Sequence, residues 1–175
     1  LETDWGQRVV LHTSGVHSSV LLDPLATLGA LTGSLHPLQS IPSLEVGLKR
    51  VPGSSFAIDG GPKALRVARF LVQAIGGTSL RIEPDARVLY HTSAVLASNG
   101  VVALVDTAMD VMKEAGLTEL QARRALMPLV QGTVENLSLL GPGKAITGPV
   151  ARGDAQTVAR HLGALGKIRG EKRRK

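Results

Sequence analysis

The sequence changes character near Pro84, and this change constrains the fold more than any other feature. Before Pro84, short apolar runs at 8–12, 30–37, 54–60 and 78–84 alternate with turns and with stretches of helical spacing. After it, residues 86–116 are apolar on almost every side, as in a buried central helix, and only helical patterns follow. The sequence therefore predicts an α/β region over 1–84, a helical domain over 85–166, and a basic, disordered tail over 167–175.

Local signals refine both halves. The strand–helix–strand pattern over 8–37 indicates a parallel βαβ unit, which alone would leave apolar strand faces and backbone groups uncovered. We therefore expect the chain to begin inside a larger parallel sheet, with further strands before residue 8. In the helical half, Thr118 and Gln121 match a capping box, Pro128 should kink or divide the helix that follows, and Asp154 should cap the last helix.

Composition narrows the functional classes. The 175 residues include no cysteine, which excludes disulfides and a cysteine nucleophile and favours a cytoplasmic protein. The five histidines are scattered without carboxylates at ligand spacing, so we expect no metal. We also expect no membrane span and no signal peptide. The net charge of +6 is concentrated in 167–175, and aromatic residues make up only 2%, so we expect no nucleic-acid partner.

Five separated motifs carry a resemblance to a known family. They are HTSG at 12–15, GSLHPLQ at 33–39, YHTSAVLASN at 90–99, GTVENL at 132–137 and TGPVARGDAQTVARHL at 147–162. Together they resemble a bacterial family of Rossmann-like proteins that pair an NAD(P)-binding domain with a helical C-terminal domain and have no assigned function. By fold, that family is similar to pyrroline-5-carboxylate reductases, ketopantoate reductases, β-hydroxyacid dehydrogenases and prephenate dehydrogenases.

The resemblance implies a fold and an activity. The fold would be α/β followed by all-α, with the last part of a Rossmann-like parallel sheet leading into a helical domain like that of 6-phosphogluconate dehydrogenase. The activity would be hydride transfer between NADP or NAD and a small carbonyl, imine or hydroxy-acid substrate, in a homodimer formed through the helical domain. An alternative is a non-catalytic dimeric ligand-binding or interaction module derived from such an enzyme.

Two features depart from that pattern. No G-x-G-x-x-G turn is present to cradle a pyrophosphate, and GGPK at 60–63 is the nearest match and too short. The β-hydroxyacid dehydrogenases place a catalytic lysine four residues before an asparagine. Asn99 fits the asparagine in this sequence, but Val95 stands at the lysine position and cannot transfer a proton.

His36, His91 and Asn99 are therefore the candidate catalytic residues. His36 ends a predicted strand at SLHP, resembling the histidine–proline motif of prephenate dehydrogenases, and an imidazole can donate or accept a proton near neutral pH. The alternative is a histidine that only caps the strand end. His91 and Asn99 share a helix face with Val95 and need polar partners, which substrate or neighbouring helices could supply.

The remaining candidates are assigned to cofactor and substrate. His12, Ser14 and Gly15 follow the first strand, where the chain of related folds passes close to the nicotinamide; a plain turn with Ser14 capping it is the alternative. Gln39, Ser98, Thr147 and Arg152 are candidate substrate-binding residues, with Arg152 suited to a carboxylate. For Arg152 the alternative is internal, with its side chain bridging to Asp154. A serine hydrolase is not expected, since no G-x-S-x-G elbow occurs.

Overall fold

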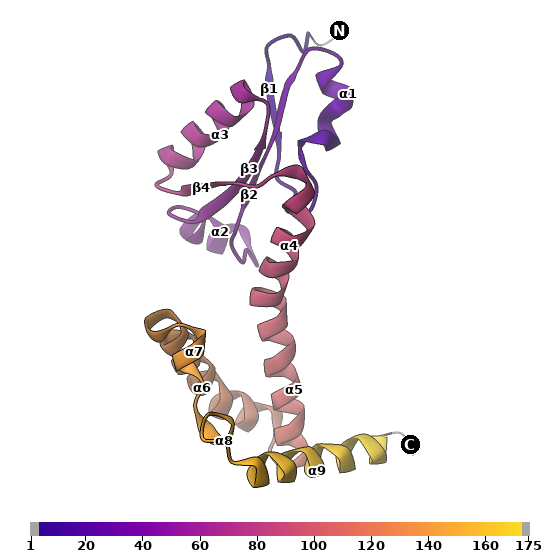
Figure 1. Cartoon of the computed structure of the whole chain (residues 1–175), viewed down its shortest axis with the longest axis vertical. Helices are drawn as coiled ribbons and strands as arrows, with labels where there is room; N and C mark the ends of the chain where they lie inside the picture. The colour runs from indigo at the N-terminus through magenta and orange to yellow at the C-terminus, as the bar shows by residue number, and fades with distance from the viewer. Residues whose placement is uncertain (1–3, 173–175) are drawn as a thin grey trace. The chain divides into compact units, whose positions relative to one another are not determined.

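The computed structural model describes residues 4–172. The chain divides into two compact units, Leu1–Gly100 and Val101–Lys175. Figure 1 labels their elements. The first unit contains, in chain order, β1 (Val9–His12), η1 (Ser19–Leu22), α1 (Asp23–Ala26), β2 (Leu31–Pro37), α2 (Leu44–Arg50), β3 (Ser55–Gly60), α3 (Pro62–Ala74), β4 (Thr78–Arg81), η2 (Pro84–Ala86), α4 (Arg87–Val95) and the π-helical turn η3 (Leu96–Gly100).

The first unit is built on a four-stranded sheet in the order β1-β2-β3-β4. The β1–β2 and β3–β4 pairs are parallel, as expected, but β2 and β3 are antiparallel, with His36 opposite Ala57. The prediction of a parallel sheet is therefore wrong for the β2–β3 pair. The α/β-then-all-α fold class is confirmed.

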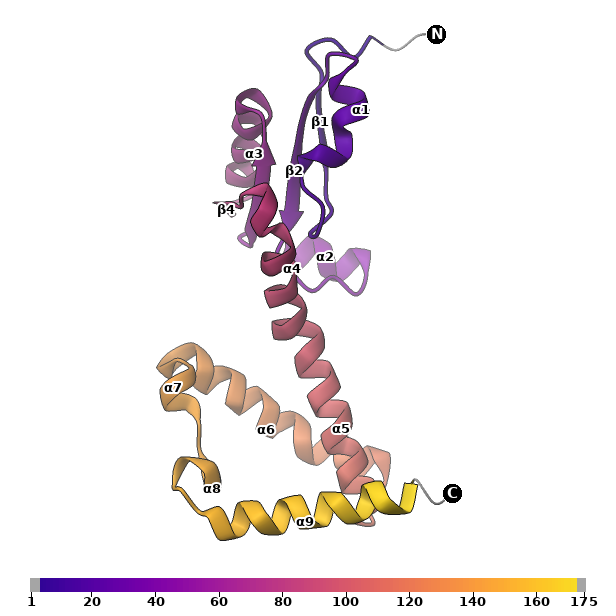
Figure 2. The same cartoon turned by 45° about the vertical axis from the view of Figure 1, so that its right-hand side comes forward.

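The core of this unit lies between the sheet and α3. The helix buries Ala64, Leu65, Ala68 and Val72, and Ile58 of β3 is fully buried against it. Figures 1 and 2 show α3 on one face of the sheet and α1 on the other. The predicted helix after β1 is reduced to η1 and the single turn α1, since Pro24 and Gly29 interrupt it.

The second unit is helical: α5 (Val101–Glu114), α6 (Glu119–Leu140), α7 (Pro142–Ala145), α8 (Gly148–Ala151) and α9 (Ala155–Lys172). The capping box is confirmed, because the Thr118 side chain accepts from the Gln121 backbone and the Gln121 side chain accepts from the Thr118 backbone. The helix α6 continues through Pro128 and is not divided. Asp154 caps the last helix by accepting from Thr157 N at 3.0 Å.

The structure differs from the sequence-based division of the chain at two places. Residues 85–100, predicted to belong to the helical domain, fall in the first compact unit. Residues 167–172, predicted to be a disordered tail, continue α9 as helix, and the rest of that tail lies outside the described residues.

The helical segment Pro84–Glu114 is strongly apolar, and most of its residues are exposed. Its most apolar stretch of 18 residues has a mean hydropathy of 1.5, and none of that stretch is buried within the chain. By length and composition alone this segment could cross a membrane, whereas the sequence predicts no span. The sequence pattern predicts a buried helix here, but these apolar side chains are exposed in the single chain. A surface outside this chain is therefore needed to bury them.

Candidate functional site

The end of β2 and the start of α4 bring together the residues that the sequence singles out. His36 is half-buried near the end of β2, and its Nδ1 lies 2.8 Å from the hydroxyl of Tyr90 on α4. The two rings meet edge to face, with their centroids 5.7 Å apart. This contact fixes the orientation of the His36 ring.

His91 and Gly15 lie on the other side of the same ring. The imidazoles of His36 and His91 have centroids 6.0 Å apart, and the buried Gly15 lies against both. A Cβ at position 15 would lie 2.5 Å from His91 Cδ2 and 2.8 Å from His36 Nε2. Only glycine fits there without moving a histidine, and the close approach of Gly15 to a nicotinamide stays a prediction.

A surface hollow of about 650 Å³ opens beside the two histidines. Of the predicted residues, His36, Gln39, His91, Ser98 and Asn99 line it, together with Val95. Its volume is within the range of small-molecule sites, which is about 300–1,000 Å³. The structure thus gathers all three predicted catalytic residues and two of the predicted substrate-binding residues around one hollow within the first unit.

A buried ion pair lies near the His36–Tyr90 contact. Arg87, at the start of α4, and Asp59 of β3 form a salt bridge of 3.0 Å, with side chains only 1% and 4% exposed. Arg87 also donates to the Ser34 hydroxyl and to the carbonyls of Ser14 and His17, at 3.3 and 3.1 Å. It therefore ties α4 to β2, β3 and the loop that carries Gly15.

Asp59 completes this network. Its carboxylate accepts from the Ser34 hydroxyl at 2.8 Å and from Ser19 N at 2.7 Å. The guanidinium of Arg87 is 5.9 Å from the ring centroid of Tyr90, and so the buried cation lies next to the His36–Tyr90 pair. One of its nitrogens, Nη1, is buried without a hydrogen-bond partner.

This environment favours neutral side chains. Burial lowers the pKa of His36, and the positive charges of Arg87 and His91 lower it further. Burial raises the pKa of Tyr90, and Arg87 offsets part of that effect. At neutral pH both groups are therefore uncharged, with the tyrosine protonated and the histidine carrying one ring proton.

His12 and Ser14 are engaged in their own loop. Ser14 N donates to His12 Nδ1 at 3.1 Å, while His12 Nε2 lies 2.9 Å from the Ser18 carbonyl. The Ser14 hydroxyl accepts from His17 N at 3.3 Å. These contacts are those of the turn that the sequence offered as the alternative; the cofactor role of the two residues stays a prediction.

Thr147 and Arg152 belong to the second unit. Thr147 lines a separate hollow of about 440 Å³ beside α6 and α7, and Arg152 is exposed at the end of α8. Asp154 is occupied by Thr157, whose backbone and side chain lower the pKa of the carboxyl group. No ion pair between Arg152 and Asp154 is present among the described residues, and the role of Arg152 stays a prediction.

Tyr90, Arg87, Asp59 and Ser34 were missed as site residues. A signal for two of them exists, because a charged residue within an apolar run must be paired if it is buried. Asp59 lies near the end of the apolar strand 54–60, and Arg87 begins the apolar helix.

Among the described residues, no group of three or more histidines and carboxylates could hold a metal ion.

Comparison with known proteins shows the family to which this chain belongs. The fold defines a Rossmann-like α/β unit followed by a helical unit. The chain belongs to the family described as a domain of unknown function (DUF2520), whose model matches residues 54–174. No curated protein matches the chain.

Several solved structures are similar. Protein TM1727 from Thermotoga maritima is 29% identical, covers 91% of this chain over 61% of its own length, and has a TM-score of 0.77. A protein from Bacteroides fragilis, provisionally named an NADP oxidoreductase, is 20% identical over 94% of this chain and 61% of its own, with a TM-score of 0.69. The pyrroline carboxylate reductase of Plasmodium falciparum, solved with NADP bound, is 12% identical over 93% and 66%, with a TM-score of 0.57.

These likenesses show the fold, a Rossmann-like α/β unit followed by a helical unit. The second and third are distant and show the fold alone. This chain spans 61–66% of the length of the three solved proteins.

Proposed function

We propose that this chain is the substrate-side part of an NAD(P)-dependent oxidoreductase. The reaction is hydride transfer between NADPH or NADH and a small carbonyl, imine or hydroxy-acid substrate. One observation carries the proposal: His36 lines a hollow of ligand size while Tyr90 holds its Nδ1 and Gly15 and His91 lie against its other side.

The hollow has a volume suited to the reacting end of such a cofactor and its substrate. Its lining mixes imidazole and amide groups with the small side chains of Ala94 and Ala97. The sequence has no G-x-G-x-x-G turn, so the pyrophosphate would be held outside residues 1–175. When bound, the nicotinamide supplies or accepts the hydride.

His36 donates or accepts the proton that accompanies the hydride. We propose the tautomer in which the tyrosine hydroxyl donates to Nδ1 of His36, which places the single ring proton on Nε2. In the direction of reduction, Nε2 gives this proton to the substrate oxygen or nitrogen; in the reverse direction it takes the proton back. A histidine so held replaces the lysine whose position is Val95.

His91 and Asn99 also line the hollow and orient the substrate, and Gln39 and Ser98 contribute hydrogen bonds. Gln39 is itself held, since its amide lies 3.3 Å from the Ser54 hydroxyl. Thr147 and Arg152 are further substrate-binding candidates from the second unit.

The partner that covers the apolar helices is proposed to be a second copy of this chain. In the second unit only Ala122, Leu126 and Ala145 are buried apolar residues among those described, whereas Val102, Leu104, Leu129 and Leu139 are exposed. A unit with so small a core gains stability by burying these side chains against another protein surface. Light scattering on the purified protein tests this: a dimeric mass supports it, and a monomer, or a protein recovered only with membranes, contradicts it.

The catalytic proposal is tested by NADPH and NADH oxidation with the protein purified from its natural source. Small keto acids and cyclic imines serve as substrates, and His36→Asn is compared with His161→Asn, a matched exposed histidine outside the site. Loss of a general acid lowers kcat by about 10²–10⁴-fold. Ligand binding without oxidation in the wild type would favour the non-catalytic module, and equal rates in both variants would refute the role of His36.

A further inference from the structure

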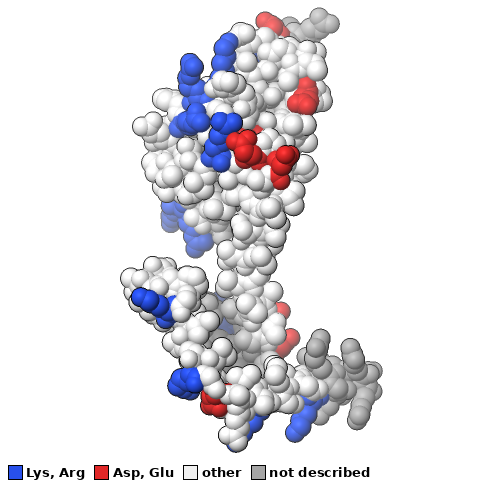
Figure 3. Space-filling model, viewed as in Figure 1, with Lys and Arg blue, Asp and Glu red and all other residues white. Residues whose placement is uncertain are grey.

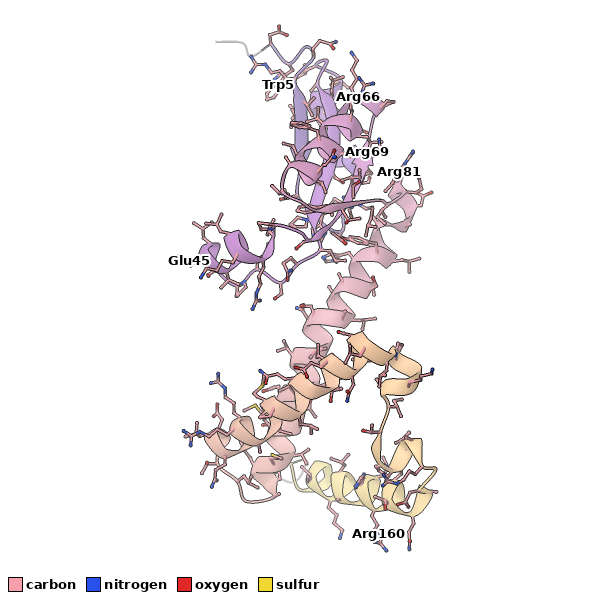
Figure 4. All side chains as sticks on the ribbon, turned by 90° about the vertical axis from the view of Figure 1, so that its left-hand side faces the viewer. Trp5, Glu45, Arg66, Arg69, Arg81 and Arg160 are labelled. Carbon is pink, nitrogen blue, oxygen red and sulfur yellow. The ribbon has the colours of Figure 1, made fainter. Side chains whose placement is uncertain are left out.

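Three arginines line a second hollow of the α/β unit. Its volume is about 620 Å³, and Arg66 and Arg69 of α3 and Arg81 at the end of β4 contribute to it. Figure 4 shows these three side chains on the same side of the unit, and Figure 3 shows lysine and arginine side chains gathered there. This hollow shares no lining residue with the hollow beside His36.

The positive charge at this place is poorly neutralised. The helix α3 contains no aspartate or glutamate, and Arg66 and Arg69 lie three residues apart on its exposed face. Arg81 pairs with Glu83 at 3.1 Å, but both side chains are exposed. Among the residues that the structure describes, no ion pair involves Arg66 or Arg69.

This arrangement of charges destabilises α3. Like charges three residues apart repel each other, and cations in the first turns of a helix oppose its dipole. Lys63 adds a third cation to the first turns of α3. Internal packing does not require these charges, because α3 packs on the sheet through Ala64, Leu65, Ala68 and Val72.

An exposed aromatic ring lies among the arginines. Phe70 follows Arg69 on the outer face of α3, is 68% exposed and lines the hollow, and Gln73 lies one turn further along. A phenylalanine so exposed gains nothing from the core, but its flat face suits the stacking of a planar ring. Charge and stacking surface therefore occur within one hollow.

We propose that this hollow binds a nucleotide. The guanidinium groups of Arg66, Arg69 and Arg81 bind its phosphate, since their planar forks match phosphate oxygens. The base lies on Phe70, and Gln73 offers a donor and an acceptor to the edge of the base. This is a nucleotide site separate from that of the reacting cofactor, and it does not depend on the function proposed for His36.

The test is calorimetric titration of the purified chain at low salt. The probes are AMP, ribose 5-phosphate, adenosine and inorganic phosphate, so that base and phosphate are scored separately. We expect AMP to bind more tightly than the other three. Arg66→Gln/Arg69→Gln should weaken AMP binding about tenfold or more, because a hydrogen bond to a charged group contributes about that factor.

Two matched controls separate this site from general charge effects. Arg123→Gln/Arg124→Gln removes two exposed arginines of α6 and should leave AMP binding unchanged, as should His36→Asn. Phe70→Ala should reduce AMP binding to the level of ribose 5-phosphate. The proposal is overturned if AMP does not bind, if inorganic phosphate binds as well as AMP, or if the Arg123/Arg124 control loses as much affinity as the Arg66/Arg69 variant.

Discussion

Replacing Arg87 should destabilise the α/β unit strongly. Arg87→Met removes the cation and leaves the Asp59 carboxylate, only 4% exposed, without its ion pair. Removing one partner of a buried ion pair costs about 3–5 kcal/mol. The variant also loses the anchors on the carbonyls of Ser14 and His17, so the loop that carries Gly15 loosens. The loss is a large part of the roughly 5–15 kcal/mol that stabilises a typical domain.

Urea unfolding followed by fluorescence measures this loss. Trp5 is the one tryptophan of the chain and lies in the first unit, so its signal reports that unit. Arg66→Met, a matched substitution at an exposed arginine, should change the free energy of unfolding by less than about 0.5 kcal/mol.

A second substitution separates the ion pair from simple packing. Asp59→Asn in the Arg87→Met background removes the uncompensated charge, and it should recover about 1–3 kcal/mol. A loss below about 1 kcal/mol for Arg87→Met, or no recovery on adding Asp59→Asn, would refute the account of the buried pair.

Four further predictions concern the same contacts and the helical unit. The folded-state pKa of His36 is lowered, so its contribution to stability is present above the unfolded pKa of about 6.5 and is lost as the pH falls towards the folded value. His36→Asn should therefore flatten this part of the plot of unfolding free energy against pH. An unchanged plot would contradict the prediction. Gly15→Ala should cost about 1–3 kcal/mol and shift the NMR signals of both imidazoles, because its Cβ would meet them; unmoved signals would count against it. Tyr90→Phe should cost about 1 kcal/mol and change the ring-nitrogen shifts of His36, and identical shifts would refute the hydrogen bond. Thr118→Ala should destabilise the helical unit by about 1 kcal/mol in circular dichroism, with the Trp5 transition as the unchanged control.

Much of the fold follows from local pattern. The four predicted strands coincide with β1 to β4, and the Thr118 and Asp154 caps occur where the sequence indicates them. These features depend on neighbouring residues, so a local rule is enough to find them. The antiparallel β2–β3 pair was not predicted, since the direction of pairing depends on the path of the connecting chain and not on either strand.

The helix α2 was missed for a different reason. It has only seven residues, buries only Gly47, and therefore has no strong apolar stripe.

The candidate site was only partly readable from the sequence. Residue chemistry selected His36, His91 and Asn99, and the structure brings them to one hollow. Tyr90 and Arg87 were not selected, because their roles depend on contacts with His36 and Asp59, which are distant in the sequence. The sequence of one chain likewise does not show which surface buries the exposed apolar face of Pro84–Glu114.

The most direct test of the central claim is the rate of NADPH oxidation by the natural protein with small keto acids and cyclic imines, measured for the wild type and His36→Asn. The account predicts substrate-dependent oxidation that falls by about 10²–10⁴-fold in the variant while substrate binding is retained. A wild-type protein that oxidises no NADPH with any of these substrates, or a variant as fast as the wild type, would contradict it.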